Sequence, residues 1–268
     1  MSIISKRFQL SVIEALVPHK TFTTGANKPL LITGVDKNGN KGDYVVKLIG
    51  AERMSKEACM RELLASLVAI QMGIRVPKPV VVNISKEFVD LLKGDDSWNF
   101  ASRSLGYNFG SEYIENLMVV SPAQELTSKQ LPFAQTIFPF DVTIQNPDRT
   151  NEKPNMMSDG TEIVIFDHEL AFSFVLDIFS NPEPWKVQQR DMEWINKHVL
   201  LPKIRRTPCD FDNFKSRLEK LDAAFWQTAK EIIPEEWLSD QFVKIQQHLV
   251  SICNNKDKFI NELKMLMS

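Results

Sequence analysis

Three residues within the stretch 141–172 have the types and the order that metal-dependent phosphoryl transfer requires. Asp148 and Asn155 lie in a polar loop, and a short apolar strand after the Asp159–Gly160 turn leads to Asp167. The two acids and the asparagine are therefore held at the ends of one predicted hairpin. Carboxylate and amide oxygens suit Mg²⁺, which keeps several waters and takes one or two carboxylates together with substrate phosphates. This arrangement predicts phosphoryl transfer.

Each of these residues also has an ordinary structural explanation. Asn146-Pro147-Asp148 is typical of a turn, because Asn side chains bond to nearby backbone and Pro fixes φ. Asp167 is equally suited to cap the N-terminus of a helix that begins at Glu169. The order of the residues favours the functional interpretation, because kinases place an Asp that orients the acceptor hydroxyl before an Asn and a second Asp that hold the metal.

A lysine in the first half of the chain lies among apolar residues of a predicted strand. Lys47 belongs to the run 43–49, and a lysine that is buried on one face of a sheet needs a carboxylate partner. The next predicted element is a helix over 56–72, ended by Gly73, and it carries Glu62. A strand lysine paired with a helix glutamate positions ATP phosphates in kinases, although Glu62 alone would be typical of a helix surface.

A polar segment with one glycine joins the stretch 8–17, which suits a strand or a short helix, to the predicted strand 30–33. If 8–17 is a strand, this order predicts a β-hairpin. Backbone N–H groups exposed in such a loop are able to close over phosphates. Protein kinases have several glycines in this loop, so the pattern by itself is typical of an ordinary hairpin. The candidate nucleotide-binding residues of the loop are Thr24, Gly25, Ala26 and Asn27.

A short segment after the next strands is a candidate hinge, whose backbone would meet the adenine edge of ATP. Its residues are Glu112, Tyr113 and Ile114, and their composition also suits a plain linker. Beyond it the chain becomes mainly helical, and the stretch 211–229 has a clear 3.6-residue apolar period. We therefore predict an α+β chain with two lobes: 1–114, with an antiparallel sheet, and 115–268, mainly helical.

Composition and charge indicate the class of protein. The chain has 268 residues, of which 43% are apolar and 25% charged, as is typical of a soluble globular protein with a real core. The net charge of −2 argues against a global basic field, so no direct nucleic-acid partner is predicted.

Two further features indicate the compartment. No apolar run approaches the length of a membrane span and the N-terminus lacks an apolar leader segment, so no membrane association is predicted. The three cysteines, Cys59, Cys209 and Cys253, are odd in number and widely spaced, which fits neither a disulfide framework nor a zinc site. A reducing, cytoplasmic location is therefore predicted.

Taken together, these motifs resemble the HipA-like kinase family, a divergent branch of the protein-kinase-like fold. The residues that carry the resemblance are Lys47, Glu62, the loop Asn146-Pro147-Asp148-Arg149, Asn155 and Phe166-Asp167-His168-Glu169. It covers nearly the whole chain, and its most specific part is 146–172. The segments around Arg61, Val76-Pro77, Phe109 and Asp167 look most like the compact members, which lack the extra N-terminal subdomain of the longer HipA toxins.

The resemblance implies a two-lobed serine/threonine kinase that uses ATP and Mg²⁺. In characterised toxin members the targets are aminoacyl-tRNA synthetases. The implied partners are thus ATP, a protein substrate such as a synthetase or another translation-related protein, and an antitoxin or regulator.

The roles implied for individual residues follow the family's motif. Lys47, held by Glu62, would contact the α- and β-phosphates; Asp148 would orient or deprotonate the acceptor hydroxyl. Asn155 and Asp167 would bind the metal, and the loop from Thr23 to Asn27 would cover the phosphates. Toxin members autophosphorylate a hydroxyl residue in that loop, and Thr23 or Thr24 would serve here.

The chain departs from the kinase pattern at two positions. The metal-binding Asn usually stands five residues after the catalytic Asp, where this chain has Lys153. Asn151 comes too early, whereas Asn155 directly precedes the apolar pair that starts the next strand, so we favour Asn155. His168 replaces the usual Phe after the metal-binding Asp, so the activation-loop logic of ordinary protein kinases does not transfer.

Two alternative functions remain open on the sequence. The first is a small-molecule kinase on the same fold, since no residue of the helical half identifies the acceptor. The second is a catalytically silent, kinase-like binding module, although the presence of Lys47, Glu62, Asp148 and Asp167 together argues against it.

Overall fold

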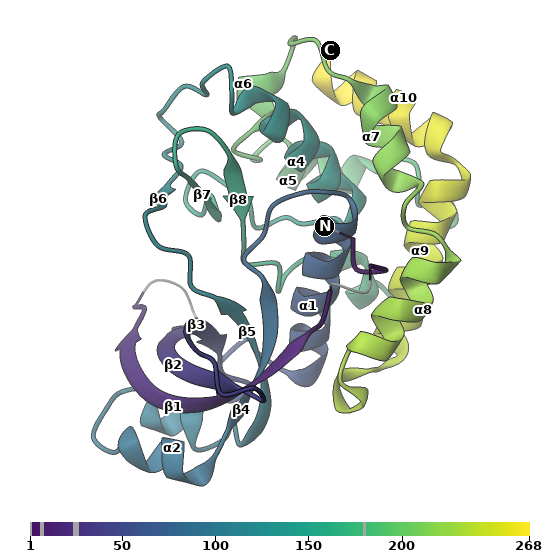
Figure 1. Cartoon of the computed structure of the whole chain (residues 1–268). Coiled ribbons are helices and arrows are strands. Elements are labelled where there is room, and N and C mark those ends of the chain that lie inside the picture. The colour runs from purple at the N-terminus through teal and green to yellow at the C-terminus, as the bar shows by residue number, and fades with distance from the viewer. Residues whose placement is uncertain (1, 6–7, 24–26, 179–180) are drawn as a thin grey trace.

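Strands rich in β-branched residues build a closed barrel in the N-terminal half of the chain (Figure 1). The computed structural model describes residues 2–5, 8–23, 27–178 and 181–268, and within these ranges the strand order of the barrel is β1-β2-β3-β5-β4. The strands are β1 (Ser11–Thr21), β2 (Leu30–Asp36), β3 (Lys41–Lys47), β4 (Pro79–Ile84) and β5 (Gly106–Glu112).

The pairing that closes the barrel is parallel and joins β1 to β4, from Ser11 opposite Val80 to Glu14 opposite Asn83. The other neighbouring strands are antiparallel, including the predicted hairpin of β1 and β2, which is confirmed. The prediction of an antiparallel sheet is therefore wrong for this one pair. Closure is favourable because it pairs two backbone edges that an open sheet would leave unpaired.

Helix α1 (Lys56–Gln71) follows the barrel strand that carries Lys47 and confirms the helix predicted over 56–72. Ser55 caps its N-terminus by accepting a hydrogen bond from the Ala58 N–H at 3.2 Å. It ends at Gly73, whose φ of +71° is accessible to glycine at little cost. Most of its side chains are buried, so α1 is a central helix rather than a surface one.

The remaining elements are helices and short strands. Helices α2 (Lys86–Leu91) and α3 (Trp98–Ala101) connect β4 to β5. A small antiparallel sheet contains β6 (Met118–Val119), β7 (Met156–Ser158) and β8 (Ile163–Ile165), and α4 (Leu131–Thr143) lies between β6 and β7 in sequence. The elements after β8 are η1 (Ser173–Leu176), η2 (Gln189–Asp191), α5 (Met192–Ile195), α6 (Leu201–Ile204), α7 (Phe211–Leu218), α8 (Ala223–Ile232), η3 (Glu235–Trp237), α9 (Asp240–Asn254) and α10 (Lys256–Met267). None of the described helices is both long enough and apolar enough to cross a bilayer.

The apolar period over 211–229 belongs to two helices, α7 and α8, and not to one continuous helix. Asp222 starts α8 as its N-cap, because its side chain accepts a hydrogen bond from the Phe225 N–H at 2.9 Å. Phe214 and Leu218 from α7 and Phe225 from α8 are nevertheless all buried. The pattern therefore predicts the buried face correctly even where the helix is interrupted.

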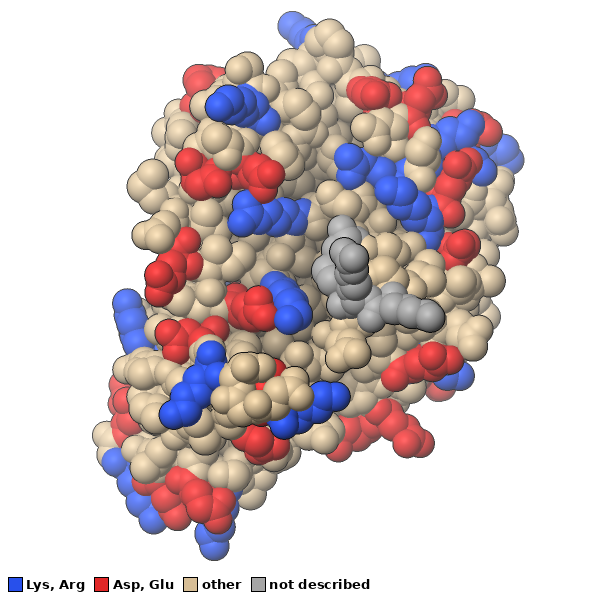
Figure 2. Space-filling model, viewed as in Figure 1, with Lys and Arg blue, Asp and Glu red and all other residues tan. Residues whose placement is uncertain are grey.

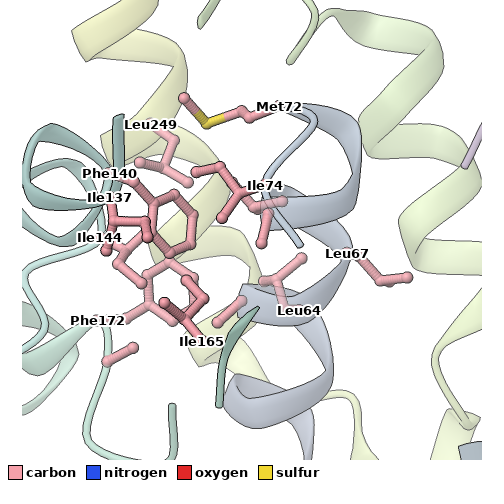
Figure 3. Packing of buried hydrophobic residues seen from close by; sticks show 14 of the residues in the cluster. Leu64, Leu67, Met72, Ile74, Ile137, Phe140, Ile144, Ile165, Phe172 and Leu249 are labelled. Carbon is pink, nitrogen blue, oxygen red and sulfur yellow. The ribbon is translucent and has the colours of Figure 1, made fainter. Parts of the chain in front are cut away.

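One hydrophobic core joins α1 to the helical half of the chain. Figure 3 shows Leu64 of α1 beside Ile165 of β8, with Phe140 of α4, Phe172 and Leu249 of α9 in the same cluster. All five side chains are buried. Burying a side chain of this size contributes about 1.5–3 kcal/mol, so the position of α1 is set by packing against the second half of the chain.

A buried ion pair lies beneath the loop 146–155. Arg149 and Asp141 are both 0% exposed, and the Nε and Nη2 atoms of Arg149 donate to the Asp141 carboxylate at 2.5 and 3.1 Å. Arg149 Nη1 also donates to the Asn155 carbonyl oxygen at 2.6 Å, and the ring of His198 lies 3.0 Å from Asp141. Burial alone would raise the pKa of Asp141, but Arg149 and His198 outweigh it and hold that pKa well below its usual range. The pair thus fixes both ends of the loop.

Most other charged side chains lie on the surface, where Figure 2 shows both signs interspersed over the barrel and the helices.

Replacing Arg149 with Leu is expected to lower the free energy of unfolding by about 3–5 kcal/mol, because Asp141 is left as a buried charge without its main partner. Urea denaturation measures the loss. The matched control is Arg190→Leu, which removes an exposed ion pair to Asp177 and is expected to change stability by less than about 1 kcal/mol. Equal effects of the two substitutions would contradict the structural role of Arg149.

Stability is also expected to fall as the pH drops from about 6.5 to 4. His248 of α9 stacks on Phe174 with ring centroids 3.7 Å apart, and burial lowers its pKa to about 4. Between its ordinary pKa and this value, the unfolded chain binds a proton that the folded chain does not, so folding weakens with acidification. Thermal unfolding at several pH values should show a smaller loss for His248→Phe than for the wild type. The matched control in the same assay is His19→Gln, which replaces an exposed histidine.

Candidate active site

The side-chain ammonium of Lys47 is the centre of a buried cluster of charges. Its Nζ atom lies 2.5 Å from the Asp167 carboxylate, 2.9 Å from Glu62 and 3.2 Å from Glu169. Lys47 is the last residue of β3, Glu62 is in the middle of α1, and the other two acids directly follow β8. The end of β3, the middle of α1 and the segment after β8 thus meet at one cation.

The electrostatics of the cluster follow from its burial. Burial alone would lower the pKa of Lys47, but Asp167, Glu62 and Glu169 outweigh it and raise that pKa well above its ordinary value, so the lysine is charged. Burial raises the pKa of Glu62, and Lys47 opposes this change. Glu62, Asp167 and Glu169 each offer a carboxylate oxygen, and these oxygens lie within 4.8 Å of one another, which suits the binding of a further cation.

The hairpin β7–β8 positions Asn155 and Asp167. Met156 pairs with Ile165, and the Phe166 N–H donates to the Asn155 carbonyl oxygen at 3.1 Å, so the two candidate metal ligands flank the open end of the hairpin. Both have positive φ, +46° for Asn155 and +62° for Asp167. Such backbone angles are uncommon outside glycine, and Asn and Asp tolerate them best, which accounts for these residue types locally.

Asp148 lies on the loop that Arg149 fixes, next to the same hairpin. The side-chain nitrogen of Asn155 donates to the Asp148 carbonyl oxygen at 3.1 Å and lies 3.4 Å from its carboxylate. Burial, together with the charge of Asp167, raises the pKa of Asp148, while Lys153 at 3.5 Å opposes this change. A carboxylate with a raised pKa is a better base for the proton of a hydroxyl group.

The donor atoms near Asp167 fit a hard divalent cation. Asp167 supplies carboxylate oxygens, and Asn155 uses its side-chain nitrogen toward Asp148, while among the described residues no hydrogen bond is made to its side-chain oxygen. Carboxylate and amide oxygens are the ligands that Mg²⁺ takes in proteins, together with water and phosphate oxygens. The residues present therefore fit Mg²⁺.

The predicted nucleotide loop is described only in part. Thr24, Gly25 and Ala26 lie outside the described residues, while Thr23 is exposed. Asn27 is buried, and its side-chain nitrogen donates to the Glu169 carboxylate, while its side-chain oxygen accepts from the Arg53 N–H at 3.0 Å. The structure thus brings the end of this loop to the Lys47 cluster.

The predicted hinge residues lie at the end of β5. The N–H groups of Glu112 and Tyr113 already donate to the carbonyl oxygens of Lys78 and Asp43, each at 2.9 Å. The two residues also line a cavity of about 350 Å³ at the end of the barrel that does not include Lys47. Their carbonyl oxygens and the partly buried Ile114 are left as candidate contacts for an adenine edge.

Glu169 belongs to the Lys47 cluster, although the sequence analysis gave it no role of its own. Its buried carboxylate contacts both Lys47 and Asn27. The acid two residues after Asp167 is visible in the sequence, but Asp167 has a positive φ and Glu169 lies in a turn, so strand alternation does not predict where its carboxylate points. His168 points the opposite way into the core, where its Nε2 atom lies 3.3 Å from Arg149 and burial lowers its pKa to about 3.

Comparison with known proteins agrees with this geometry. A family model described as HipA-like kinase matches residues 19–262. The crystal structure of a Helicobacter pylori proinflammatory kinase, CtkA, is 14% identical with a TM-score of 0.52, and the match covers 95% of each chain. At this identity the likeness establishes a shared fold.

Two further solved structures resemble the chain less closely. CtTel1 in its open conformation is 12% identical with a TM-score of 0.31, over 94% of this chain and 12% of that one. The MAP kinase LmaMPK10 from Leishmania major is 11% identical with a TM-score of 0.29, over 90% of this chain and 85% of that one. No curated protein matches the chain.

The family match spans most of the sequence, including all of the residues that surround Lys47. The chain belongs to the HipA-like kinase family.

Proposed function

We propose that this kinase is an ATP- and Mg²⁺-dependent serine/threonine protein kinase. The observation that carries the proposal is the contact of Lys47 with both Glu62 and Asp167, beside the partly buried Asp148. A fixed cation, a hard-metal ligand and a carboxylate base within one site are the parts that phosphoryl transfer requires. The lobes 1–114 and 115–268 would then enclose the nucleotide between them.

Each residue has a role in this proposal. Lys47, oriented by Glu62, holds the α- and β-phosphates, and Asn155 and Asp167 hold Mg²⁺. Bound Mg²⁺ would neutralise the charge that develops on the transferring group. Asp148 orients the acceptor hydroxyl and takes its proton as the oxygen bonds to the γ-phosphorus and the bond to ADP breaks. Catalysis therefore rests on positioning and on charge, with no covalent intermediate on the protein.

A protein acceptor is proposed because the chain belongs to the HipA-like kinase family. A translation-related protein is the first acceptor to test. We propose action in the cytoplasm, where the three free cysteines would stay reduced. Incubation of a cell lysate with γ-labelled ATP, followed by separation of proteins from small molecules, tests the acceptor class. Label confined to the small-molecule fraction would exclude a protein kinase and leave a small-molecule kinase.

Asp148→Ala is expected to lower the rate of phosphoryl transfer by at least about 100-fold while ADP binding in the presence of Mg²⁺ changes little, because Asp148 acts on the acceptor hydroxyl. Asp167→Ala is expected to abolish the increase in nucleotide affinity that Mg²⁺ produces, because it removes a metal ligand. Steady-state transfer assays and calorimetric ADP titrations with and without Mg²⁺ measure both effects.

The matched control is Asp159→Ala, since Asp159 lies at the exposed turn of the same hairpin and caps it through the N–H groups of Thr161 and Glu162. It should retain transfer and Mg²⁺-dependent binding. Wild-type turnover by both Asp148→Ala and Asp167→Ala would refute the site assignment. If ATP with Mg²⁺ fails to raise the thermal stability of the wild type, the chain is a silent binding module.

A further inference from the structure

Two consecutive residues of α1, Arg61 and Glu62, form hydrogen bonds with the backbone of the two residues that follow Asp167. The Glu62 carboxylate accepts a hydrogen bond from the His168 N–H at 2.9 Å. The side chain of the preceding residue, Arg61, donates from Nε to the Glu169 carbonyl oxygen at 3.2 Å. Glu62 thus accepts a hydrogen bond from the backbone of this segment, and Arg61 donates one to it.

These two bonds act on a residue whose backbone is strained. Asp167 has a φ of +62°, which Asp tolerates better than most residues but which still costs free energy, so contacts on both sides stabilise it. On its N-terminal side, the Phe166 N–H bond to the Asn155 carbonyl supplies that restraint. On its C-terminal side the restraint comes from Glu62 and Arg61. The direction of the Asp167 carboxylate therefore depends on α1.

Arg61 is itself held by the C-terminal helices. Its Nη1 atom donates to the side-chain oxygen of Gln241 at 2.8 Å, and Gln241 lies in the first turn of α9. Arginine has a long side chain with high rotamer entropy, so a second fixed contact is needed to hold its Nε atom on one carbonyl oxygen. The contacts form a continuous path from α9 through Arg61 to the backbone after Asp167.

We infer that Arg61 is a positioning residue for the metal-binding acid Asp167, and that Gln241 orients Arg61 for this task. The inference rests on the proposed function, since it assigns to Arg61 a role in Mg²⁺ binding by Asp167. In this proposal Arg61 acts through the Glu169 carbonyl oxygen and is not itself a metal ligand. It makes the affinity of the site for Mg²⁺ dependent on α9, a helix far from Asp167 in sequence.

The test measures the dissociation constant of ADP by calorimetry, once with Mg²⁺ and once with EDTA. The ratio of the EDTA value to the Mg²⁺ value is the Mg²⁺ gain. Arg61→Met retains the apolar stem and removes the donors, and it should lower the gain from Mg²⁺ by about 10-fold, as for other residues that orient metal ligands. Gln241→Leu should lower the gain several-fold, and the double variant should be no worse than Arg61→Met, because both act along one path.

Two controls separate positioning from general stability. Gln241→Glu keeps an acceptor for Arg61 and should retain the wild-type gain. Lys56→Met removes a contact of α1 to Glu236, 4.0 Å apart and exposed, and should also retain it. A residue with a structural role alone would change the unfolding temperature and leave the Mg²⁺ gain of the folded protein intact.

A wild-type Mg²⁺ gain in folded Arg61→Met and in Gln241→Leu overturns the inference and leaves the kinase proposal standing. If Arg61→Met does not fold, the partly buried Gln241 carries the test by itself, with Gln241→Glu as its partner variant. Absence of any Mg²⁺ gain in the wild type would instead refute the proposed function, and the inference with it.

Discussion

The structure depends on one buried ammonium group. Lys47 contacts three carboxylates from two separate segments, and the removal of these charges from water is costly unless their geometry is maintained. The barrel holds the lysine, α1 holds Glu62, and the hairpin β7–β8 holds Asp167. The barrel, α1 and the hairpin β7–β8 therefore each support one member of this cluster. The hydrophobic core around α1 holds α1 against the second half of the chain.

A second buried pair supports the opposite side of the site. Arg149 and Asp141 fix the loop that carries Asp148, and the same guanidinium reaches the backbone of Asn155. The residues proposed as base and as metal ligand are thus both held by one buried guanidinium. Buried polar networks of this kind make a unique conformation when every member is satisfied, which suits a site that works by positioning.

The sequence predicts those site residues whose signals are local. Lys47 in an apolar strand, and Asp148, Asn155 and Asp167 around one hairpin, are candidates because type and spacing are visible within short windows, and the structure places Lys47 against Asp167 and Asn155 against Asp148. The parallel pairing of β1 and β4 was not predicted, because nothing local specifies which distant edge a strand will meet. The contacts of Glu169 were missed because they depend on how the chain returns to Asn27 and Lys47.

Helix α1 is enclosed on nearly every side, by the core beneath it and by α8, α9 and η3. Withdrawing it from Lys47 would expose Leu63, Leu64, Leu67 and Val68, at about 1.5–3 kcal/mol each. The summed cost of exposing these four side chains is larger than roughly 5.5 kcal/mol. That is the difference in binding free energy that a ligand needs to change the ratio of two conformations from about 1:99 to 99:1. Swinging this helix outward is therefore strongly disfavoured in the folded protein, and the burial of α1 keeps Glu62 against Lys47.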